Sequence, residues 1–366
     1  MKKVKNILII ALPALVIFGF LAFSLLKTPE EYSLSERRTL ARMPDITLEE
    51  LSSGRFMTRF EEYTQDQFPL RDSFRSLKAN VLRTLFRQKD NHGLYLLDGY
   101  LSKLEYPENT ARLTQSGQKL QQIRDTYLAG TDCRLYLSVV PDKNCFLAPL
   151  GGYPTLDYGA LVGQLRERLP EAQYLDIFGC LSLEDYYLTD QHWRQERIVP
   201  VAQAIAGGMG AEIDTNFTKV ELEVPFYGAY YGQAALSVQP DELCYLTNET
   251  LEGCTVTSYN TGKPKPALMY DLEKARGRDP YEMFLCGSDP LVVIENPNAA
   301  SDRELVVFRD SFGSTLVPLL ASGYAKITLV DLRYIHSAML GSFIQFENQD
   351  VLFLYSTLVL NNTISM

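Results

Sequence analysis

Three residues whose types cooperate in acyl-group chemistry stand out in the chain: Asp190, His192 and Ser311. Residues two apart on an extended segment point to the same side, about 6.5–7 Å apart at Cα, so Asp190 can hold the imidazole of His192. A carboxylate on one ring nitrogen fixes the tautomer and leaves the other nitrogen free to take a proton from a serine hydroxyl. We therefore predict a hydrolase-type triad in which Asp190 orients, His192 acts as base and Ser311 attacks.

The surroundings of Ser311 favour this interpretation. The apolar run 304–308 predicts a strand and 312–321 predicts a helix, so Ser311 falls at a strand-to-helix turn. A hydroxyl there is exposed at the sheet edge, and the free N–H groups of the helix can stabilise an oxyanion. The sequence around it is not G-x-S-x-G. In the alternative interpretation Asp310 and Ser311 are ordinary N-cap residues. His336 is the competing base.

Two further residues are candidates for supporting roles. Pro141-Asp142-Lys143-Asn144 follows a predicted buried strand, and ligand sites of α/β sheets collect in such loops. Lys143 is therefore a candidate for binding or orienting substrate, although a loop lysine is commonly only solvated. The run Phe284-Leu285-Cys286 leads into Gly287. We expect the Gly287 N–H to approach the site as a second oxyanion donor.

Aromatic residues are the other candidates for substrate binding. Trp193 is the single tryptophan of the chain. It either packs beneath His192 or contacts a sugar directly. Tyr230 lies in Phe226-Tyr227-Gly228-Ala229-Tyr230-Tyr231-Gly232, and aromatic faces stack on sugar rings while their hydroxyls hydrogen-bond to them. The alternative is that this segment packs in the core or in a loop.

The order of predicted elements indicates how these residues come together. Strands are predicted at 135–140, 174–177, 304–308, 326–330 and 351–355, and helices at 109–128, 158–169 and 194–206. Alternating strands and helices indicate an α/β fold, with a parallel sheet of about five strands flanked by helices. Asp98-Gly99 predicts a hairpin near its start. A β-rich insertion, rich in Tyr, Gly and Thr, is expected at about 215–282.

The first 26 residues predict an N-terminal signal anchor. A basic stretch precedes residues 7–26, twenty residues without a charge, which is the length that crosses a hydrocarbon core of about 30 Å. Basic residues before the span place the N-terminus in the cytoplasm and the C-terminal domain outside the cell membrane, in a single-pass topology. The alternative is a cleaved signal peptide, for which the only cleavage pattern, Ala22-Phe23-Ser24, is poor.

Residues 27–90 form a polar segment rich in Arg and Glu. Its apolar residues recur at roughly helical spacing, and Pro69 breaks the pattern in two. The segment is either a membrane-proximal helical stalk or an amphipathic helix pair packed on the α/β domain, which we place at 91–366.

Charge and cysteine content exclude other classes of protein. The net charge is −10 and the pI about 5.0, which argues against a nucleic-acid partner. The six cysteines are irregularly spaced without a C-x-x-C, and only Cys244 and Cys254 flank a plausible turn across which they could pair. There is no zinc pattern, and with three histidines a multi-histidine site would need nearly all of them. We predict no cofactor.

Three segments resemble those of a known family. Tyr187-Leu188-Thr189-Asp190-Gln191-His192-Trp193, Val139-Val140-Pro141-Asp142-Lys143-Asn144 and Arg309-Asp310-Ser311-Phe312-Gly313 are similar to the hallmark segments of the DHHW proteins. These in turn resemble the SGNH-like acetyltransferase domains of alginate O-acetylation proteins. The resemblance implies an SGNH-hydrolase-like fold and carries the triad onto Asp190, His192 and Ser311. Gln191 stands where the signature has its first histidine.

The resemblance implies a function in the bacterial envelope. We expect a serine O-acyl(acetyl)transferase or esterase that acts on a cell-surface polysaccharide or a peptidoglycan sugar. A transferase would need a multi-span membrane O-acyltransferase as acyl donor, which the resemblance alone implies. One alternative is a non-catalytic envelope protein for carbohydrate binding or assembly. A lipase-like hydrolase shares the triad and would differ in its activity on long-chain esters.

Overall fold

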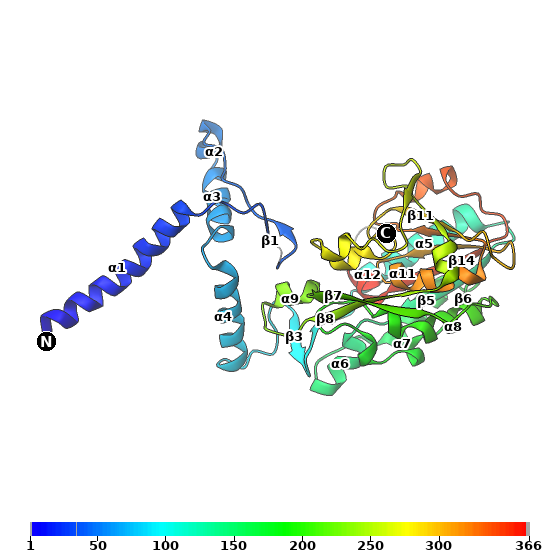
Figure 1. The fold of residues 1–366 in the computed structure, drawn as a ribbon, viewed down its shortest axis with the longest axis horizontal. Helices are drawn as coiled ribbons and strands as arrows, with labels where there is room; N and C mark the ends of the chain where they lie inside the picture. Colours follow the sequence, from blue (N-terminus) through cyan, green and yellow to red (C-terminus); the bar gives the residue numbers. More distant parts are fainter. Residues whose placement is uncertain (1, 34, 364–366) are drawn as a thin grey trace. The chain divides into compact units, whose positions relative to one another are not determined.

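The structure, a computed structural model, describes residues 2–33 and 35–363. The chain divides into two compact units (Figure 1). One unit is made of Met1–His92 and Tyr231–Ser237, and the other of Gly93–Tyr230 and Val238–Met366.

The first unit contains mainly helices. Helix α1 (Lys2–Leu26) includes the stretch Val4–Leu26, which has a mean hydropathy of 2.7 and is long and apolar enough to cross a membrane. The elements that follow are β1 (Tyr32–Ser33), β2 (Arg38–Thr39), α2 (Leu48–Ser52), α3 (Arg55–Asp66) and α4 (Arg71–Thr84). Pro69 falls between α3 and α4, where the sequence predicts a break.

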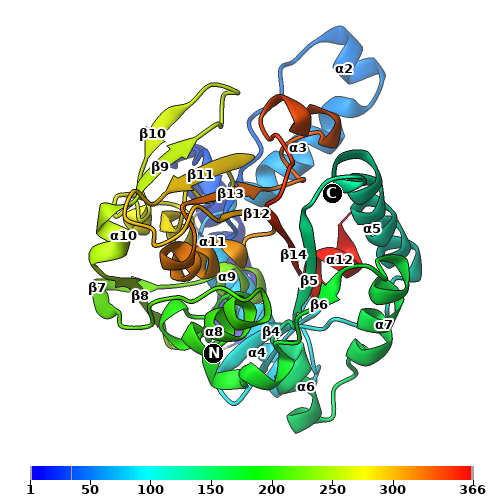
Figure 2. The same ribbon diagram turned by 90° about the vertical axis from the view of Figure 1, so that its right-hand side faces the viewer.

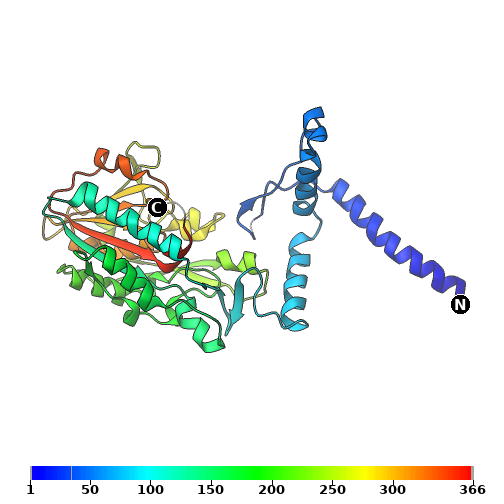
Figure 3. The ribbon, with the colours of Figure 1, turned by 180° about the vertical axis from the view of Figure 1, so that it is seen from behind.

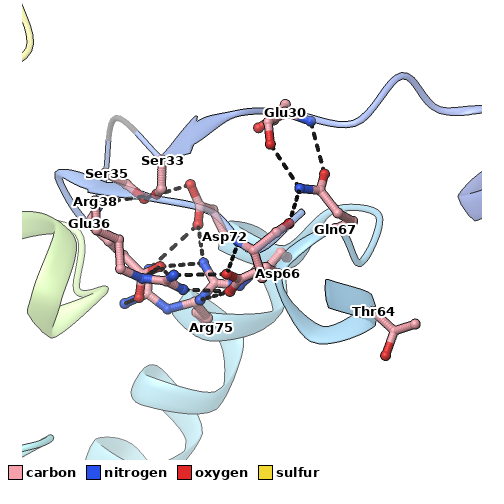
Figure 4. Close-up of polar contacts among 12 residues, drawn as sticks. Glu30, Ser33, Ser35, Glu36, Arg38, Thr64, Asp66, Gln67, Asp72 and Arg75 are labelled. Carbon is pink, nitrogen blue, oxygen red and sulfur yellow. Dashed lines mark hydrogen bonds and ion pairs between the residues drawn. The ribbon is translucent and has the colours of Figure 1, made fainter. Parts of the chain in front are cut away.

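An ion-pair network ties the β1–β2 segment to α3 and α4 (Figure 4). Glu36 pairs with Arg38 at 3.1 Å, with Arg71 at 2.6 Å and with Arg75 at 3.1 Å. Arg38 also donates two hydrogen bonds to Asp66, at 2.5 and 2.8 Å. The Arg38 guanidinium lowers the pKa of Asp66 to about 2. The network therefore holds together segments that are about 30 residues apart in the chain.

An eight-stranded sheet forms the centre of the second unit. Its strands lie in the order β10-β9-β11-β13-β12-β14-β5-β6. In chain order they are β5 (Arg134–Val140), β6 (Gln173–Tyr174), β9 (Thr255–Ser258), β10 (Lys265–Ala267), β11 (Leu291–Glu295), β12 (Glu304–Arg309), β13 (Lys326–Val330) and β14 (Asp350–Ser356). The five strands from β13 to β6 are parallel, and β11, β9 and β10 extend one edge by antiparallel pairing.

The five parallel strands are those that the sequence predicts, so the expected α/β sheet is confirmed. The expected number of about five strands in the whole sheet was wrong, because β9, β10 and β11 also join it. These three strands are only three to five residues long, and β9 and β10 come from the predicted insertion. Strand β6 is also shorter than predicted and ends at Tyr174.

Helices cover both faces of this sheet (Figures 2 and 3). Successive residues of a strand point to opposite faces. In β14, Val351 and Phe353 pack with α5 (Thr110–Ile123), α7 (Tyr158–Arg168) and α12 (Thr357–Asn362), whereas Leu352 and Leu354 pack with α8 (Val199–Gly208) and η7 (Val317–Gly323). The remaining helices are η1 (Arg124–Leu128), α6 (Asn144–Gly151), η2 (Phe178–Cys180), η3 (Leu183–Asp185), η4 (Gln195–Arg197), α9 (Ala229–Ala234), α10 (Glu249–Gly253), η5 (Lys274–Arg276), η6 (Pro280–Met283), α11 (Gly313–Leu316) and η8 (Ser337–Ser342).

Two hairpins complete the second unit. Strands β3 (Leu94–Leu97) and β4 (Tyr100–Lys103) pair through the predicted turn, in which Asp98 and Gly99 have φ of 48° and 84°, as a type I′ turn requires. Strands β7 (Thr218–Phe226) and β8 (Asp241–Thr247) form a separate antiparallel sheet. The predicted β-rich insertion therefore contributes both this hairpin and two strands of the main sheet.

The helix predicted at 194–206 starts later than expected. The chain first forms the short 3₁₀ helix η4, and α8 begins at Val199. Pro200 is the reason, because proline has no N–H to donate and is tolerated in the first turn of a helix but not in its interior. His192 consequently does not stand at the N-terminus of α8.

The six cysteines are all free thiols, so the possible pairing of Cys244 with Cys254 is not formed. Cys244 lies inside β8, while Cys254 precedes β9, and the two strands belong to different sheets. Burial raises the pKa of Cys145 to about 12 and those of Cys244, Cys254 and Cys286 to about 11. These thiols are therefore neutral at physiological pH.

The packing of β14 predicts how far a cavity at Leu354 would lower the stability of the fold. Leu354 is fully buried, so Leu354→Ala is expected to lower the free energy of unfolding by about 2–5 kcal/mol. The matched control is Leu150→Ala, because Leu150 is 64% exposed. Urea denaturation of the detergent-solubilised chain measures both. Equal losses in the two variants would contradict this description of the core.

Candidate active site

The structure brings Asp190, His192 and Ser311 together. His192 Nδ1 lies 2.5 Å from Asp190 Oδ1, and His192 Nε2 lies 2.7 Å from Ser311 Oγ. Asp190 and His192 are buried and Ser311 is half-buried. When Nδ1–H donates to the carboxylate, Nε2 accepts from the serine hydroxyl. The arrangement is that of a general base facing a nucleophile.

A tight loop between Tyr186 and Trp193 presents the first two of these residues. Its ends pair as an isolated antiparallel bridge, and the Tyr187 N–H donates to the His192 carbonyl at 3.1 Å. Inside the loop, the His192 N–H donates to Asp190 Oδ1 at 3.1 Å. The same carboxylate oxygen therefore fixes both the backbone and the ring of His192.

Asp241, the first residue of β8, holds this loop from outside. Its carboxylate accepts from the N–H groups of Leu188 (2.6 Å) and Thr189 (2.8 Å) and from the Thr189 hydroxyl. Burial raises the pKa of Asp241. No sequence signal marks Asp241, because its partners are more than 50 positions away and it follows no local pattern.

Gly228 and Ala229 support Asp190 on its other side. The Ala229 N–H donates to Asp190 Oδ2 at 2.8 Å. A Cβ on Gly228 would lie only 2.3 Å from Asp190 Cβ and 2.5 Å from Asp190 Cα, so the close approach requires glycine. The signal in the sequence is a glycine within the aromatic segment 226–232, for which sugar binding and packing were the two interpretations.

Aromatic rings hold the plane of the His192 imidazole. The Tyr281 ring stacks on it with a centroid distance of 3.7 Å and an interplanar angle of 4°, and the Phe312 ring lies 4.9 Å away. The Tyr281 hydroxyl is 3.1 Å from Thr315 Oγ1. Burial raises the pKa of Tyr281 well above its usual value, so the phenol stays neutral. The sequence analysis assigned no role to Tyr281.

The Ser311 turn is fixed by its neighbour Asp310. Asp310 Oδ1 accepts from the Phe312 N–H at 3.0 Å, and Oδ2 accepts from the N–H and the hydroxyl of Ser356 at 2.7 and 2.6 Å. The Gly313 N–H donates to the Asp310 carbonyl. These two N–H groups are therefore not free to stabilise an oxyanion. The expectation that they are free is corrected.

Gly287 does not take the predicted position of an oxyanion donor. Leu285, Cys286 and Gly287 have positive φ values of 44°, 63° and 60°, so the segment is a turn and not a strand. The Gly287 N–H donates to the Phe284 carbonyl, and the Gly287 carbonyl accepts from Arg309 Nη2. Both backbone polar groups of Gly287 are thus used inside the fold.

Lys143 is not a surface residue. It is 2% exposed, and its Nζ donates to the carbonyls of Leu101 (2.7 Å), Asp190 (2.6 Å) and Leu188 (3.4 Å). Burial lowers the pKa of Lys143 to about 7. The expectation that Lys143 binds substrate is corrected, because its hydrogen-bond donors are directed at the backbone.

Trp193 and Tyr230 are also buried. Trp193 Nε1 donates to Thr315 Oγ1 at 2.7 Å, and its ring meets Phe312 edge-on. Trp193 therefore packs beneath the site, which was one of the two alternatives. Tyr230 is 4% exposed and its ring lies 5.5 Å from Lys143 Nζ. Neither side chain is available to stack on a sugar, so both substrate-binding expectations are corrected.

Gln191, which replaces the first histidine of the signature, lies beside the base. Its Nε2 is 3.3 Å from His192 Nε2, the nitrogen that faces Ser311. The side chain is half-buried. Within residues 2–33 and 35–363, no group of three or more His, Cys, Asp or Glu side chains is placed to hold a metal ion.

Comparison with solved structures identifies the fold. The chain aligns with a DHHW family protein from Eubacterium siraeum at a TM-score of 0.59 and 19% identity, over 75% of this chain and 93% of that one. This chain has the fold of a DHHW family protein. PatB1 of Bacillus cereus, solved with a sulfonyl adduct, aligns at a TM-score of 0.56 and 20% identity, over 74% and 96% of the two chains. No family model and no curated protein sequence matches the chain.

The DHHW-like fold confirms the resemblance predicted from the three sequence segments. Those segments meet at one place, since Lys143 contacts the Asp190 loop and His192 contacts Ser311. At 19–20% identity the comparisons establish the fold alone. The roles of the triad residues consequently rest on the geometry described above.

Substitution of Gly228 tests whether its close approach to Asp190 maintains the geometry of the site. In Gly228→Ala the new methyl group collides with Asp190, so we expect Asp190 to move away from His192 and labelling of Ser311 by a fluorophosphonate to slow by about 100-fold. Gly207→Ala is the matched control, because a Cβ there meets nothing within 4 Å. Mass spectrometry of the labelled chain measures both rates. Unchanged labelling in Gly228→Ala would contradict the role of this close approach.

Proposed function

We propose that this protein is an envelope-associated serine O-acyltransferase or esterase that transfers or removes an acyl group, acetyl in the simplest case, on a cell-surface polysaccharide or a peptidoglycan sugar. The observation that carries the proposal is the continuous hydrogen-bond chain from Asp190 through His192 to Ser311. A buried carboxylate, a histidine and a half-buried serine in this order are the parts of a nucleophilic acyl-transfer site.

The first half of the reaction forms an acyl-enzyme. Ser311 Oγ attacks the carbonyl carbon of the acyl donor while its proton passes to His192 Nε2. The bond between the acyl carbon and the donor oxygen then breaks, and that oxygen takes the proton from His192. Asp190 holds the ring through Nδ1 and stabilises the imidazolium in between.

The second half returns the enzyme to its starting state. An acceptor hydroxyl gives its proton to His192 Nε2 and attacks the acyl carbon, and Ser311 leaves with the proton restored. Water as acceptor makes the enzyme an esterase, whereas a sugar hydroxyl makes it a transferase. The amide of Gln191 adjoins the same Nε2 nitrogen, so we expect it to contact the acceptor.

Two further observations support this assignment. The sulfonyl adduct of Bacillus cereus PatB1 is consistent with a nucleophile in this fold, because sulfonyl groups are transferred to nucleophiles. The apolar helix α1, with basic residues at its N-terminal end, supports a membrane anchor that places the second unit outside the cytoplasm. As a transferase the protein would receive its acyl group from a multi-span membrane O-acyltransferase.

Hydrolysis of an aryl acetate tests the serine mechanism. We expect Ser311→Ala and His192→Ala to lower kcat/KM by at least about 10⁴-fold, because triad members act as a unit. His336→Ala is the matched control, since His336 is exposed and caps η8, and its activity should equal that of the wild type. Addition of envelope glycans, followed by mass spectrometry for acetylated sugars, distinguishes transfer from hydrolysis.

Equal rates for the wild type and Ser311→Ala would reject the serine mechanism. Glycan binding that persists in His192→Ala, together with no phosphonate on Ser311, would then favour a non-catalytic carbohydrate-binding or assembly protein. Preference for long-chain over acetyl esters would instead indicate a lipase-like hydrolase.

A further inference from the structure

We propose that Lys143 is a positioning residue for the triad, which fixes the backbone of Asp190 and balances the charge of its carboxylate from inside the protein. This inference rests on the proposed acyl transfer. It gives a role to the Pro141-Asp142-Lys143-Asn144 segment, which was expected to face substrate and does not.

Three carbonyl oxygens converge on the Lys143 ammonium. Two belong to Leu188 and Asp190 in the loop between Tyr186 and Trp193, here called the catalytic loop because it carries Asp190 and His192. The third belongs to Leu101 in β4. An ammonium group has three N–H donors and no acceptor, so it can satisfy all three oxygens at once. The Leu101 N–H also donates to the Leu188 carbonyl at 2.8 Å. Lys143 therefore joins the β3–β4 hairpin, the loop after β5 and the catalytic loop.

Position and charge act on the same residue. The carbonyl of Asp190 receives the 2.6 Å hydrogen bond from Lys143, while its carboxylate receives that of His192 at 2.5 Å. A shift of the carbonyl moves the carboxylate with it, and displacements of about 1 Å cost enzymes about 100-fold in rate. Lys143 thus acts on the base through Asp190, without touching substrate.

The surroundings of the ammonium are those of a buried ion. The carboxylates of Asp190 and Asp241 face it and favour its charged form, whereas burial disfavours that form. The rings of Tyr100 and Tyr230 flank Nζ, with centroids at 5.9 and 5.5 Å, and attract the cation. One cation accordingly faces two buried carboxylates, that of Asp190 in the catalytic loop and that of Asp241 at the start of β8.

Two substitutions of Lys143 distinguish the effect of its hydrogen bonds on the position of Asp190 from the effect of its charge. Lys143→Met keeps the length of the side chain and removes both the donors and the charge. We expect kcat to fall by about 100-fold with KM within about twofold. We also expect the acid limb of the kcat/KM profile to move to higher pH, because loss of the cation makes protonation of the Asp190–His192 pair easier. Lys143→Arg keeps the charge but spreads its donors in a plane, so kcat should fall while the acid limb stays in place.

Asp142→Asn is the matched control. Asp142 is equally buried on the same loop and accepts from Thr357 Oγ1, from the Tyr158 hydroxyl and from the Asn144 N–H, with no hydrogen bond to the catalytic loop. The substitution perturbs the same segment, so it reports what a loss of stability alone does to kcat. We expect kcat of this variant to stay within about threefold of the wild type.

A second measurement does not depend on turnover. The proton between His192 Nδ1 and Asp190 Oδ1 should give a far-downfield proton NMR resonance in the full chain in detergent, and loss of that resonance in His192→Gln assigns it. We expect Lys143→Met to shift or remove the resonance and Asp142→Asn to keep it. If Lys143→Met does not fold, Lys143→Arg is judged by the same two readouts.

The outcomes are distinct. Unchanged kcat and an unchanged resonance in Lys143→Met would overturn the proposal, as would an equal loss of kcat in Asp142→Asn at matched thermal stability. If Ser311→Ala retains full activity, the proposed function fails, and the resonance alone then decides whether Lys143 positions Asp190.

Discussion

The site depends on the carboxylate of Asp190, which is buried away from water and still accepts several hydrogen bonds. Burial of an ionised carboxyl group costs several kcal/mol unless donors replace the lost water. Asp190 is 1% exposed, and the donors come from the ring and the N–H of His192 and from the Ala229 N–H. The loop geometry, the glycine at position 228 and the ammonium of Lys143 all serve to hold this one side chain in place.

The nucleophile and the base reach the site from different kinds of structure. Ser311 follows β12, which lies between its parallel neighbours β13 and β14 in the sheet. Asp310 ties the Ser311 turn to Ser356 at the end of β14. Sites of parallel sheets form at this carboxyl edge of the strands. The base is carried by a loop whose position depends on β8 and β4. The sheet thus supplies the nucleophile. Contacts from β8, from β4 and from Lys143 in the loop after β5 place the base against it.

Features with a local signal could be predicted, and features with a long-range cause could not. The five parallel strands follow from continuous apolar runs, and the triad follows from residue chemistry although 119 positions separate His192 from Ser311. Residue type alone does not give the direction of a side chain. Substrate contact was one interpretation for each of Lys143, Trp193 and Tyr230, and all three are buried. Gly287 was expected to be a donor, but its turn uses the N–H internally. Asp241 had no local pattern at all.

The state of the cysteines has a consequence for where the chain can fold. Disulfide exchange and oxidation require a thiolate, and burial keeps four of the six thiols neutral. No cross-link joins the cysteines, all of which lie within the described residues. The native state of this domain consequently needs neither an oxidant nor a disulfide isomerase to form. Once the domain has folded, burial protects these four thiols from oxidation and exchange, even in an oxidising compartment.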